Sequence, residues 1–474
     1  MNSNSVLLVN EDELQIKELT IDQAYEITGG HGLYQFIVAA SIAIMIFSNM
    51  FYLFSVPLFI ITPVVLDKNG IPFKDIETAC NSTYYYEDKH FNYITEFDLL
   101  CSPMRASIIS SMFQVGITIS GLILGSISDR IGRIPIFLLE ECGIVFSLAA
   151  IMYFNNYTAC LFFTAMCGFF SFAPLCYPFA YEWNHSKYIK FYASYIGIMY
   201  ATGELIVAGL IWVGFKWREA CICAIIVCFI YMLFPWFIED GPKYYYSKGK
   251  VNYAIKVFKQ VAKVNKKPIT HRFTLIDVSA NLAKAGTFKE QLRLICQKWV
   301  LFRLGICCCI FFACGFIYFG FSLNVQKFIG NPYMNAICNG IAEIIGVITI
   351  YILSSYKGIH FSLFCAFIIT FLVLVVQYFN SNHQVIANCA MYIGKFSISG
   401  GFTLAYTLGG ELFPTAVSTT CIAVLSLSER IGAIISPIVG NNPTYFMIMA
   451  AVCSFIAGVA VLVLYCKVKN DIHK

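Results

Sequence analysis

Long apolar runs recur along most of the chain, each about as long as a helix must be to cross a lipid bilayer. Spanning the hydrocarbon core takes about 20 apolar residues in an α-helix. Twelve runs meet this requirement, at residues 35–60, 106–127, 136–154, 158–180, 194–215, 219–238, 299–321, 333–355, 360–379, 385–408, 418–440 and 444–466. The first run follows a polar segment with acidic character, so we interpret it as a span and not as a cleaved signal peptide. The pattern predicts an all-α membrane protein with twelve transmembrane helices.

The runs fall into two groups of six, separated by a basic segment. Transporters built from two six-helix halves hold their substrate near the midplane, between the halves. The predicted parts are an N-terminal cytoplasmic segment (1–34), a first six-helix half (35–238) with an extracellular loop (61–104), a basic cytoplasmic loop (239–298), a second six-helix half (299–466) and a cytoplasmic tail (467–474).

The basic loop contains one stretch with helical periodicity. In Val251–Lys267 the apolar residues recur at helical spacing and lysines occupy the other face. This pattern predicts an amphipathic helix that lies on the inner leaflet or caps the cytoplasmic ends of the spans. A calmodulin-type target site is the alternative.

Composition and charge agree with a membrane protein and fix its orientation. The chain is 58% hydrophobic and 12% charged, whereas soluble domains contain roughly 25% charged residues. Segment 239–298 carries thirteen Lys and Arg against four acidic residues, and such loops face the cytoplasm. Both termini are therefore expected inside. The net charge of +5 comes mostly from this bias, so no nucleic-acid partner is needed to explain it.

Most of the twenty cysteines are expected to be reduced. Eighteen fall in spans or on the cytoplasmic side, where a reduced cysteine acts as a small apolar side chain. Cys80 and Cys101 fall in the loop expected outside, where they form a disulfide or remain free. In the same loop, Asn81 begins an Asn-Ser-Thr glycosylation sequon. The cysteine spacing does not resemble a zinc site, and we expect no metal and no cofactor.

A stretch of glycine and charge, LILGSISDRIGRIP, joins the second and third runs. Gly125 permits close helix packing, and Gly132 permits a tight turn. Asp129 can cap a helix or form an ion pair, while Arg130 and Arg133 favour the cytoplasmic side. Judged on charge alone, an ordinary positively charged loop is an equal alternative.

Seven further motifs make a family resemblance specific. They are ITEFDLLC (94–101), YEW (181–183), KWR (216–218), GPKYYYSKGK (241–250), YFGFSLN (318–324), GKFSISGGFTLAYTLGGELFPT (394–415) and SERIGAIISP (428–437). Together with the loop after the second run, their order and spacing resemble the organic cation, anion and zwitterion (carnitine-type) transporters of the major facilitator superfamily. The resemblance implies two six-helix halves that transport small organic ions by alternating access in the plasma membrane.

The resemblance also implies a cytoplasmic latch, made of charge pairs that close the inner side of the outward-open state. The residues at the matching places are Gly125, Asp129, Arg130, Gly132, Arg133, Glu182 and Glu411. A partly exposed pair contributes about 1 kcal/mol, which shifts a two-state equilibrium about fivefold.

Three arginines of the family pattern are missing. The region of Thr164 lacks the arginine expected near the start of the fourth span, and Ser418 replaces one after the Glu411 motif. The loop Ser354–Lys357 lacks the charges expected between the eighth and ninth spans. These departures favour an alternative in which the chain is a receptor or scaffold that does not transport.

Charged residues inside spans are costly, and each is therefore a hypothesis about function. Glu343 matches a glutamate of the cation and zwitterion members, and Arg430 matches an arginine of the anion and zwitterion members. The resemblance thus implies two poles that hold an ammonium and a carboxylate. The candidate substrate-binding residues are Glu343, Arg430, Lys395, Tyr318 and Glu204. In the alternative, Glu343, Lys395 and Arg430 neutralise one another as a structural network.

Glu204 is unusual for the family, and in apolar surroundings a carboxyl group can carry a proton. Transport is expected to proceed either by facilitated diffusion or by coupling to protons or to sodium. We do not expect an enzyme, because the chain has no phosphate-binding loop and no catalytic constellation at a usable spacing. A sugar carrier shares the loop after the second span, but the motifs that begin at Glu96 and Gly394 argue against it.

Overall fold

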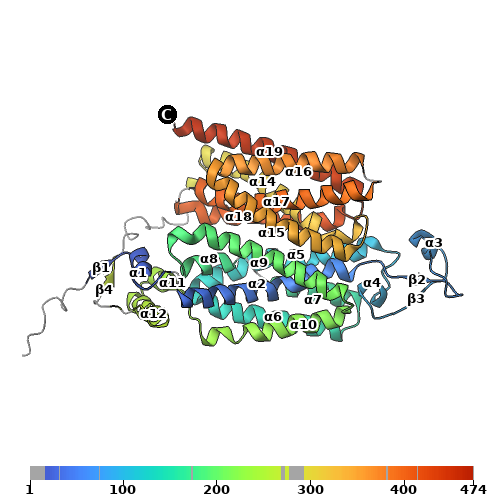
Figure 1. The fold of residues 1–474 in the computed structure, drawn as a ribbon, viewed down its shortest axis with the longest axis horizontal. Coiled ribbons are helices and arrows are strands. Elements are labelled where there is room, and N and C mark those ends of the chain that lie inside the picture. The colour runs from blue at the N-terminus through green and yellow to red at the C-terminus, as the bar shows by residue number, and fades with distance from the viewer. Residues whose placement is uncertain are drawn as a thin grey trace, which may run out of the picture.

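The long helices form two bundles that lie side by side, the first half blue to green and the second yellow to red in Figure 1. This computed structural model describes residues 17–30, 32–73, 75–171, 175–267, 269, 273–276, 293–380, 383–413 and 415–472. The first half contains α2 (Leu33–Phe59), α5 (Pro103–Ile131), α6 (Arg133–Tyr153), α7 (Tyr157–Phe169), α8 (Cys176–Glu182), α9 (Ile189–Trp212) and α10 (Trp217–Tyr231). The second half contains α14 (Lys298–Leu323), α15 (Pro332–Lys357), α16 (Ile359–Phe379), α17 (Gln384–Leu412), α18 (Thr415–Val439) and α19 (Pro443–Ile472).

Ten of the described helices are long and apolar enough to cross a membrane. The fourth and tenth predicted runs account for the other two spans. The fourth run is divided into α7 and α8, and the sequence has Pro174 between them, a residue that cannot donate a helical backbone hydrogen bond. The tenth run is α17, a single long helix that contains Lys395 and many small polar residues.

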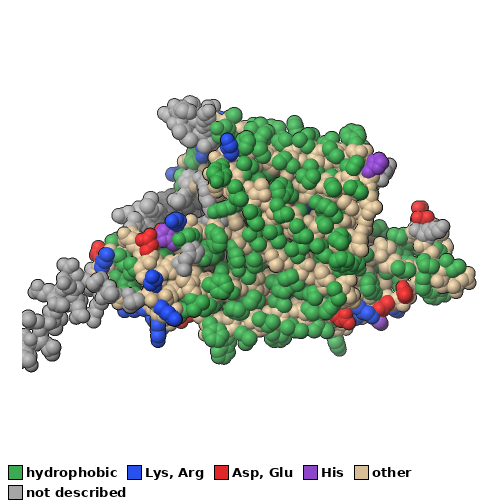
Figure 2. Space-filling view, viewed as in Figure 1, with side chains coloured by type: hydrophobic (Ala, Val, Ile, Leu, Met, Phe, Trp, Pro, Cys, Tyr) green, Lys and Arg blue, Asp and Glu red, His purple; other side chains and the backbone are tan. Residues whose placement is uncertain are grey.

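The sides of the bundle are apolar and its two ends carry the charges, as Figure 2 shows for one face. Large aliphatic and aromatic side chains are exposed along the outer helices, among them those of Leu122, Phe146, Phe229 and Leu372. Contiguous apolar surface of this extent is stable only when lipid covers it.

One end of the bundle carries a small folded unit with its own core, which we call the end module. It consists of β1 (Lys17–Leu19), α1 (Ile21–Ile27), α11 (Pro242–Ser247), α12 (Val251–Val264) and β4 (Phe273–Leu275). Strands β1 and β4 pair in parallel, and Tyr25 and Phe258 pack in the core beneath them. The amphipathic stretch is therefore helical, and its apolar face covers α1 and the end of the bundle.

The segment between α2 and α5 folds at the other end (Figure 1). It contains β2 (Val65–Leu66), α3 (Ile76–Cys80), β3 (Tyr85–Tyr86) and α4 (Tyr93–Glu96). Cys80 and Cys101 are joined by a disulfide, and Asn81 is exposed beside it. Three short 3-10 helices complete the described elements: Ser186–Tyr188, Phe234–Trp236 and Val325–Lys327.

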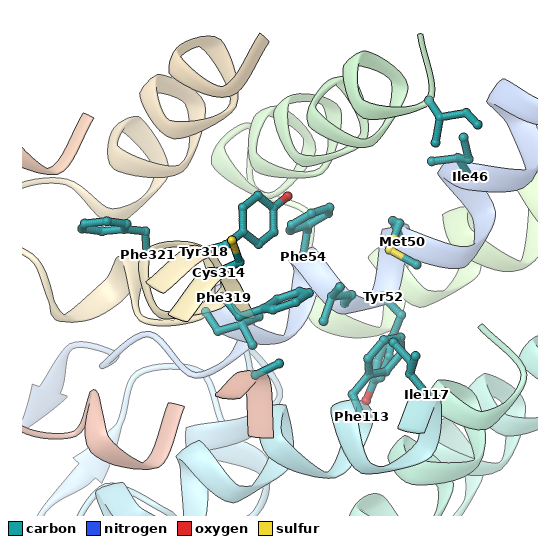
Figure 3. Packing of buried hydrophobic residues seen from close by; sticks show 14 of the residues in the cluster. Ile46, Met50, Tyr52, Phe54, Phe113, Ile117, Cys314, Tyr318, Phe319 and Phe321 are labelled. Atoms are coloured by element: carbon teal, nitrogen blue, oxygen red, sulfur yellow. The ribbon is translucent and has the colours of Figure 1, made fainter. Parts of the chain in front are cut away.

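The two halves meet through the pairs α5–α18 and α9–α15, with a smaller contact between α2 and α14. Figure 3 shows Tyr318 and Phe319 of α14 beside Phe54 of α2 in this region. Within the second half, α15 and α17 can approach closely because Gly346 has no side chain: a Cβ atom there would stand 2.1 Å from the carbonyl oxygen of Phe396. This approach brings Glu343, one turn before Gly346, toward Lys395.

Candidate functional site

Lys395 is the centre of a buried cluster of charged side chains between the halves. Its Nζ lies 2.7 Å from Oε2 of Glu343 and 3.7 Å from Oε2 of Glu204. It donates a hydrogen bond of 2.6 Å to Ser322 and stands 3.6 Å from the centre of the Tyr318 ring. The side chains of Lys395, Glu204 and Glu343 are at most 4% exposed. We call these five residues the lysine cluster.

The lysine cluster draws on four helices and on both halves of the protein. Glu343 is on α15, Lys395 on α17, and Tyr318 and Ser322 are one turn apart on α14. Tyr318 donates a 2.8 Å hydrogen bond to Oε1 of Glu343, which fixes that carboxylate from a second side. Glu204, on α9, is the contribution of the first half. The ion pair between Glu204 and Lys395 therefore crosses the boundary between the halves.

Arg430 belongs to a second charged group. One of its guanidinium nitrogens lies 3.5 Å from Oε1 of Glu429, and the other donates at 3.4 Å to the side chain of Gln114 on α5. The guanidinium carbon stands 5.8 Å from the centre of the Phe319 ring. The fully buried Glu429 also accepts a hydrogen bond from Tyr406. We call these five residues the arginine cluster.

Aromatic rings connect the two clusters. The ring centre of Phe402 lies 5.0 Å from that of Tyr318 and 5.6 Å from that of Tyr406. Glu343 and Arg430, expected as the poles of one site, thus have separate partners in this conformation. Lys395 neutralises Glu343, and Glu429 neutralises Arg430. The alternative of one network made of Glu343, Lys395 and Arg430 is therefore replaced by two ion pairs. Lys395 pairs with Glu343, and Arg430 pairs with Glu429.

The predicted latch residues meet at the end that carries the end module. Arg133 donates to Oε1 of Glu182 through two nitrogens, at 2.9 and 3.2 Å, and to Asp129 at 2.6 Å. Gly132 has a φ of 111°, which a side chain would strain, and Oδ1 of Asp240 accepts the backbone N–H of Arg133 at 2.7 Å. Burial raises the pKa of Asp240, and the hydrogen bonds from the backbone N–H groups of Arg133 and Ile134 oppose the rise.

These latch contacts join parts of the first half to one another. They connect α5, α6, α8 and the segment before α11. The side chain of Arg130 is exposed, and its carbonyl oxygen accepts a hydrogen bond from the hydroxyl of Tyr244 in the end module. The carbonyl oxygen of Gly125 accepts a hydrogen bond from the hydroxyl of Ser128. The side chains of Glu411 and Ser418 lie outside the described residues.

The end module is attached directly to this latch region. Tyr25 donates a 2.5 Å hydrogen bond to the carbonyl oxygen of Glu182. The side chain of Asn265 donates to the carbonyl oxygens of Thr28 and Gly29 and accepts from the backbone N–H of Tyr34. The sequence predicted neither attachment, because nothing in the local pattern shows that Tyr25 meets Glu182 or that Asn265 meets Thr28.

A neutral network occupies the place where the family pattern has an arginine. The buried Thr164 hydrogen-bonds to the hydroxyl of Tyr52 at 2.8 Å, and Tyr52 hydrogen-bonds to that of Tyr93 at 2.9 Å. The Ser354–Lys357 segment ends α15, and there the hydroxyl of Ser354 donates to the carbonyl oxygen of Tyr351 in the same helix. No group of three His, Cys, Asp or Glu in the described part of the chain is placed to hold a metal ion.

A further ion pair anchors the segment between α2 and α5. Arg218 donates to both carboxylate oxygens of Glu96 at 2.8 Å, and His90 contacts the same carboxylate at 2.8 Å. Both partners lie in motifs that carried the family resemblance, EFDLLC and KWR. The sequence therefore contained a signal for this pair, although its role was not identified.

Comparison with known proteins identifies the family. The model of the Major Facilitator Superfamily matches residues 38–437. The chain belongs to this superfamily. It is 27% identical over 370 residues to organic anion transporter 3 of Oryctolagus cuniculus, a match that covers 76% of this chain and 68% of that protein. It is also 23% identical over 408 residues to solute carrier family 22 member 6 of Mus musculus, covering 80% and 75%.

A solved structure of the same superfamily confirms the fold. The proton:xylose symporter XylE bound to 6-bromo-6-deoxy-D-glucose matches with a TM-score of 0.64 and covers 91% of this chain and 95% of its own. At 12% identity this likeness concerns the fold alone. The prediction of a transporter related to the organic ion carriers is confirmed. The protein is a multi-pass transporter of the major facilitator superfamily and not an enzyme.

Proposed function

We propose that this protein carries small organic ions that bear a carboxylate across the plasma membrane by alternating access, with both termini in the cytoplasm. The observation that carries the proposal is the pair of buried cations, Lys395 and Arg430, at the boundary between the halves. Each belongs to the second half and has a partner from the first, Glu204 for Lys395 and Gln114 for Arg430. A substrate bound here can change both links between the halves at once.

Arg430 is the residue we assign to the substrate carboxylate. Its guanidinium is always charged and offers donors in a fixed fork that matches a carboxylate. The Glu429 contact, at 3.5 Å, is longer than a charge-assisted hydrogen bond of about 2.8 Å, which leaves Arg430 able to take a second acid. The rings of Phe319 and Tyr406 supply an apolar wall for the body of an aromatic or aliphatic acid.

The substrate's charge also depends on Glu343. This carboxylate already has a lysine at 2.7 Å and a tyrosine hydroxyl at 2.8 Å, so a substrate ammonium would have to displace Lys395 to reach it. The geometry therefore favours an organic anion over a zwitterion, and the relatives named organic anion transporters support the same choice.

Uptake of labelled p-aminohippurate, carnitine and tetraethylammonium by cells that express the protein tests this proposal. We expect p-aminohippurate to be taken up most strongly, and Arg430→Ala to abolish that uptake. Glu343→Gln should reduce p-aminohippurate uptake less, because the Glu343 carboxylate pairs with Lys395 and not with the substrate. If carnitine is preferred and Glu343→Gln removes that preference, the two-pole site for a zwitterion is correct instead. If none of the three solutes enters while the protein is at the cell surface, the non-transporting receptor is the better description.

A further inference from the structure

The lysine cluster contains more acid than base. Two carboxylates, Glu204 and Glu343, face the single ammonium of Lys395, and all three side chains are buried. If all three were ionised, the cluster would keep one uncompensated negative charge in a place from which water is excluded. An uncompensated charge within a membrane span costs several kcal/mol unless it is paired or neutralised.

The two carboxylates are not equivalent. Glu343 has an ammonium at 2.7 Å and accepts a hydrogen bond from Tyr318, and both contacts stabilise its ionised form. Glu204 stands 3.7 Å from the same ammonium, 1.0 Å farther than Glu343, and none of the side-chain hydroxyl bonds described here reaches it. The carboxylate with the weaker contacts is the one that takes up a proton first.

Within the described part of the chain, the surroundings of Glu204 supply no other compensating charge. The charged groups that act on it from neighbouring helices are Glu343 on α15 and Lys395 on α17. Tyr318 on α14 also faces it, and Tyr200, one turn earlier on α9, lies near Glu343. The helices α2, α8 and α10 also pack on α9, and no charged side chain of theirs acts on Glu204 among the described residues.

We propose that Glu204 is a proton-binding site that couples transport of the organic ion to a proton gradient. This inference rests on the proposed function, since it assigns the coupling ion to the same site. The step is a simple protonation, in which an O–H bond forms on the carboxylate as a proton enters and breaks as the proton leaves on the other side. Transfer of one proton with one monocarboxylate moves no net charge.

Protonation of Glu204 changes a contact between the halves, and this gives the proton its influence on the conformational equilibrium. Ionised Glu204 on α9 attracts Lys395 on α17, and this attraction ties the first half to the second. Protonated Glu204 no longer does so, while Lys395 stays with Glu343 inside the second half. The proton thus weakens one link that opposes rocking of one half against the other.

Infrared difference spectroscopy of the purified full-length protein during a pH titration tests the site without any substrate. We expect one component of the titrating carboxylic-acid absorption of the wild type to be lost in Glu204→Gln, while the components from other buried glutamates remain. Glu140→Gln is the matched control, because Glu140 is also a fully buried glutamate but lies on α6, away from the lysine cluster. That control should retain the component assigned to Glu204, and replacing sodium by choline should leave it unchanged.

Proteoliposomes with an imposed pH gradient provide the transport measurement. If one proton moves with each substrate, a gradient of one pH unit raises accumulation of p-aminohippurate up to about tenfold. The ratio of uptake with and without the gradient should fall to about one in Glu204→Gln and persist in Glu140→Gln. Glu204→Asp keeps a carboxyl group and should retain a titrating band at a displaced pH, which guards against a glutamine variant that fails to fold.

The outcomes separate the two proposals. The assignment of the proton to Glu204 is overturned if Glu204→Gln has the same titrating components as the wild type, if the component assigned to Glu204 disappears in Glu140→Gln, or if that component moves with sodium. A pH-gradient effect on uptake that Glu204→Gln leaves intact also overturns it. If the band behaves as expected but no organic ion is transported by the wild type, the proposed function fails while the proton site stands.

Discussion

The ion pair between Glu96 and Arg218 should hold the segment between α2 and α5 onto the bundle. The side chain of Glu96 is 1% exposed, and Arg218 reaches both of its oxygens from the first turn of α10. Replacing Glu96 with Gln keeps the shape of the side chain but removes the charge, leaving a guanidinium without its carboxylate. We expect this change to loosen α4 and the residues that follow it.

The lowered pKa of Glu96 gives the size of the free energy that the ion pair contributes to folding. Burial by itself raises the pKa of this carboxyl group, but hydrogen bonds from Arg218 and His90 outweigh burial and lower it from 4.5 to about 2. Each tenfold change in acidity corresponds to about 1.4 kcal/mol, so the ionised form gains roughly 3 kcal/mol in the folded state. Because Arg218 is about a third exposed and partly screened by water, we expect about 2 kcal/mol for the loss of the pair.

The sign of the pH dependence follows from the same values. The folded-state pKa is lowered, so the stabilisation is fully present above the ordinary value of 4.5 and is lost as the pH falls toward about 2. The wild type should therefore approach the behaviour of Glu96→Gln in that range, while the variant itself should change little.

Hydrogen exchange of peptides that cover residues 93–101 measures the local opening. A loss of about 2 kcal/mol should speed exchange there about 30-fold in Glu96→Gln at neutral pH. The matched control is Lys216→Gln, which removes a pair with Asp88 in which both side chains are more than a third exposed. That change should leave exchange nearly unaltered. Equal exchange in Glu96→Gln and the wild type, or an equal effect of the control, would refute the reasoning.

The remaining predictions concern topology and the latch. Asn81→Gln should remove a glycan and raise gel mobility after expression in a glycosylating cell, because the exposed sequon belongs to the loop predicted outside. A wild type without a glycan would contradict that topology. Arg133→Ala should increase labelling of a cysteine introduced by Ala193→Cys in the cleft between α9, α15 and α17 several-fold, since it removes the bonds that hold α8 to α6, and α8 packs on α9. Asp129→Asn should have a smaller effect because Asp129 is 60% exposed, and equal effects would show that the exposed pair contributes as much as the buried one.

The sequence alone was sufficient to predict the helices and the family. Twelve long apolar runs require lipid whatever their arrangement, and helical backbone bonding is obligatory there, so composition and periodicity determine the fold class. Motif order identified the superfamily, and the excess of lysine and arginine in one loop predicted the orientation. Local chemistry also located the amphipathic helix α12, because its apolar positions repeat at helical spacing.

The partners of the buried charges depended on the tertiary structure. The sequence marked Glu204, Glu343, Lys395 and Arg430 as costly residues, but each had several acids or bases within reach on other spans. Because α15 and α17 approach closely at Gly346, Glu343 forms an ion pair with Lys395. The contact between α9 and α15 brings Glu204 near the same lysine.

The partner of Arg430 could not be predicted from the sequence either, although that partner is the preceding residue of the same helix. Neighbouring residues of a helix point about 100° apart, so their spacing does not predict a contact between Glu429 and Arg430. The long arginine side chain nonetheless reaches back to 3.5 Å from the glutamate, while Tyr406 holds that acid from α17. A chain's pattern determines which side chains must be neutralised in the membrane. Only the packing of helices distant in sequence decides which group neutralises each one, because electrostatic pairing depends on distances that local sequence does not contain.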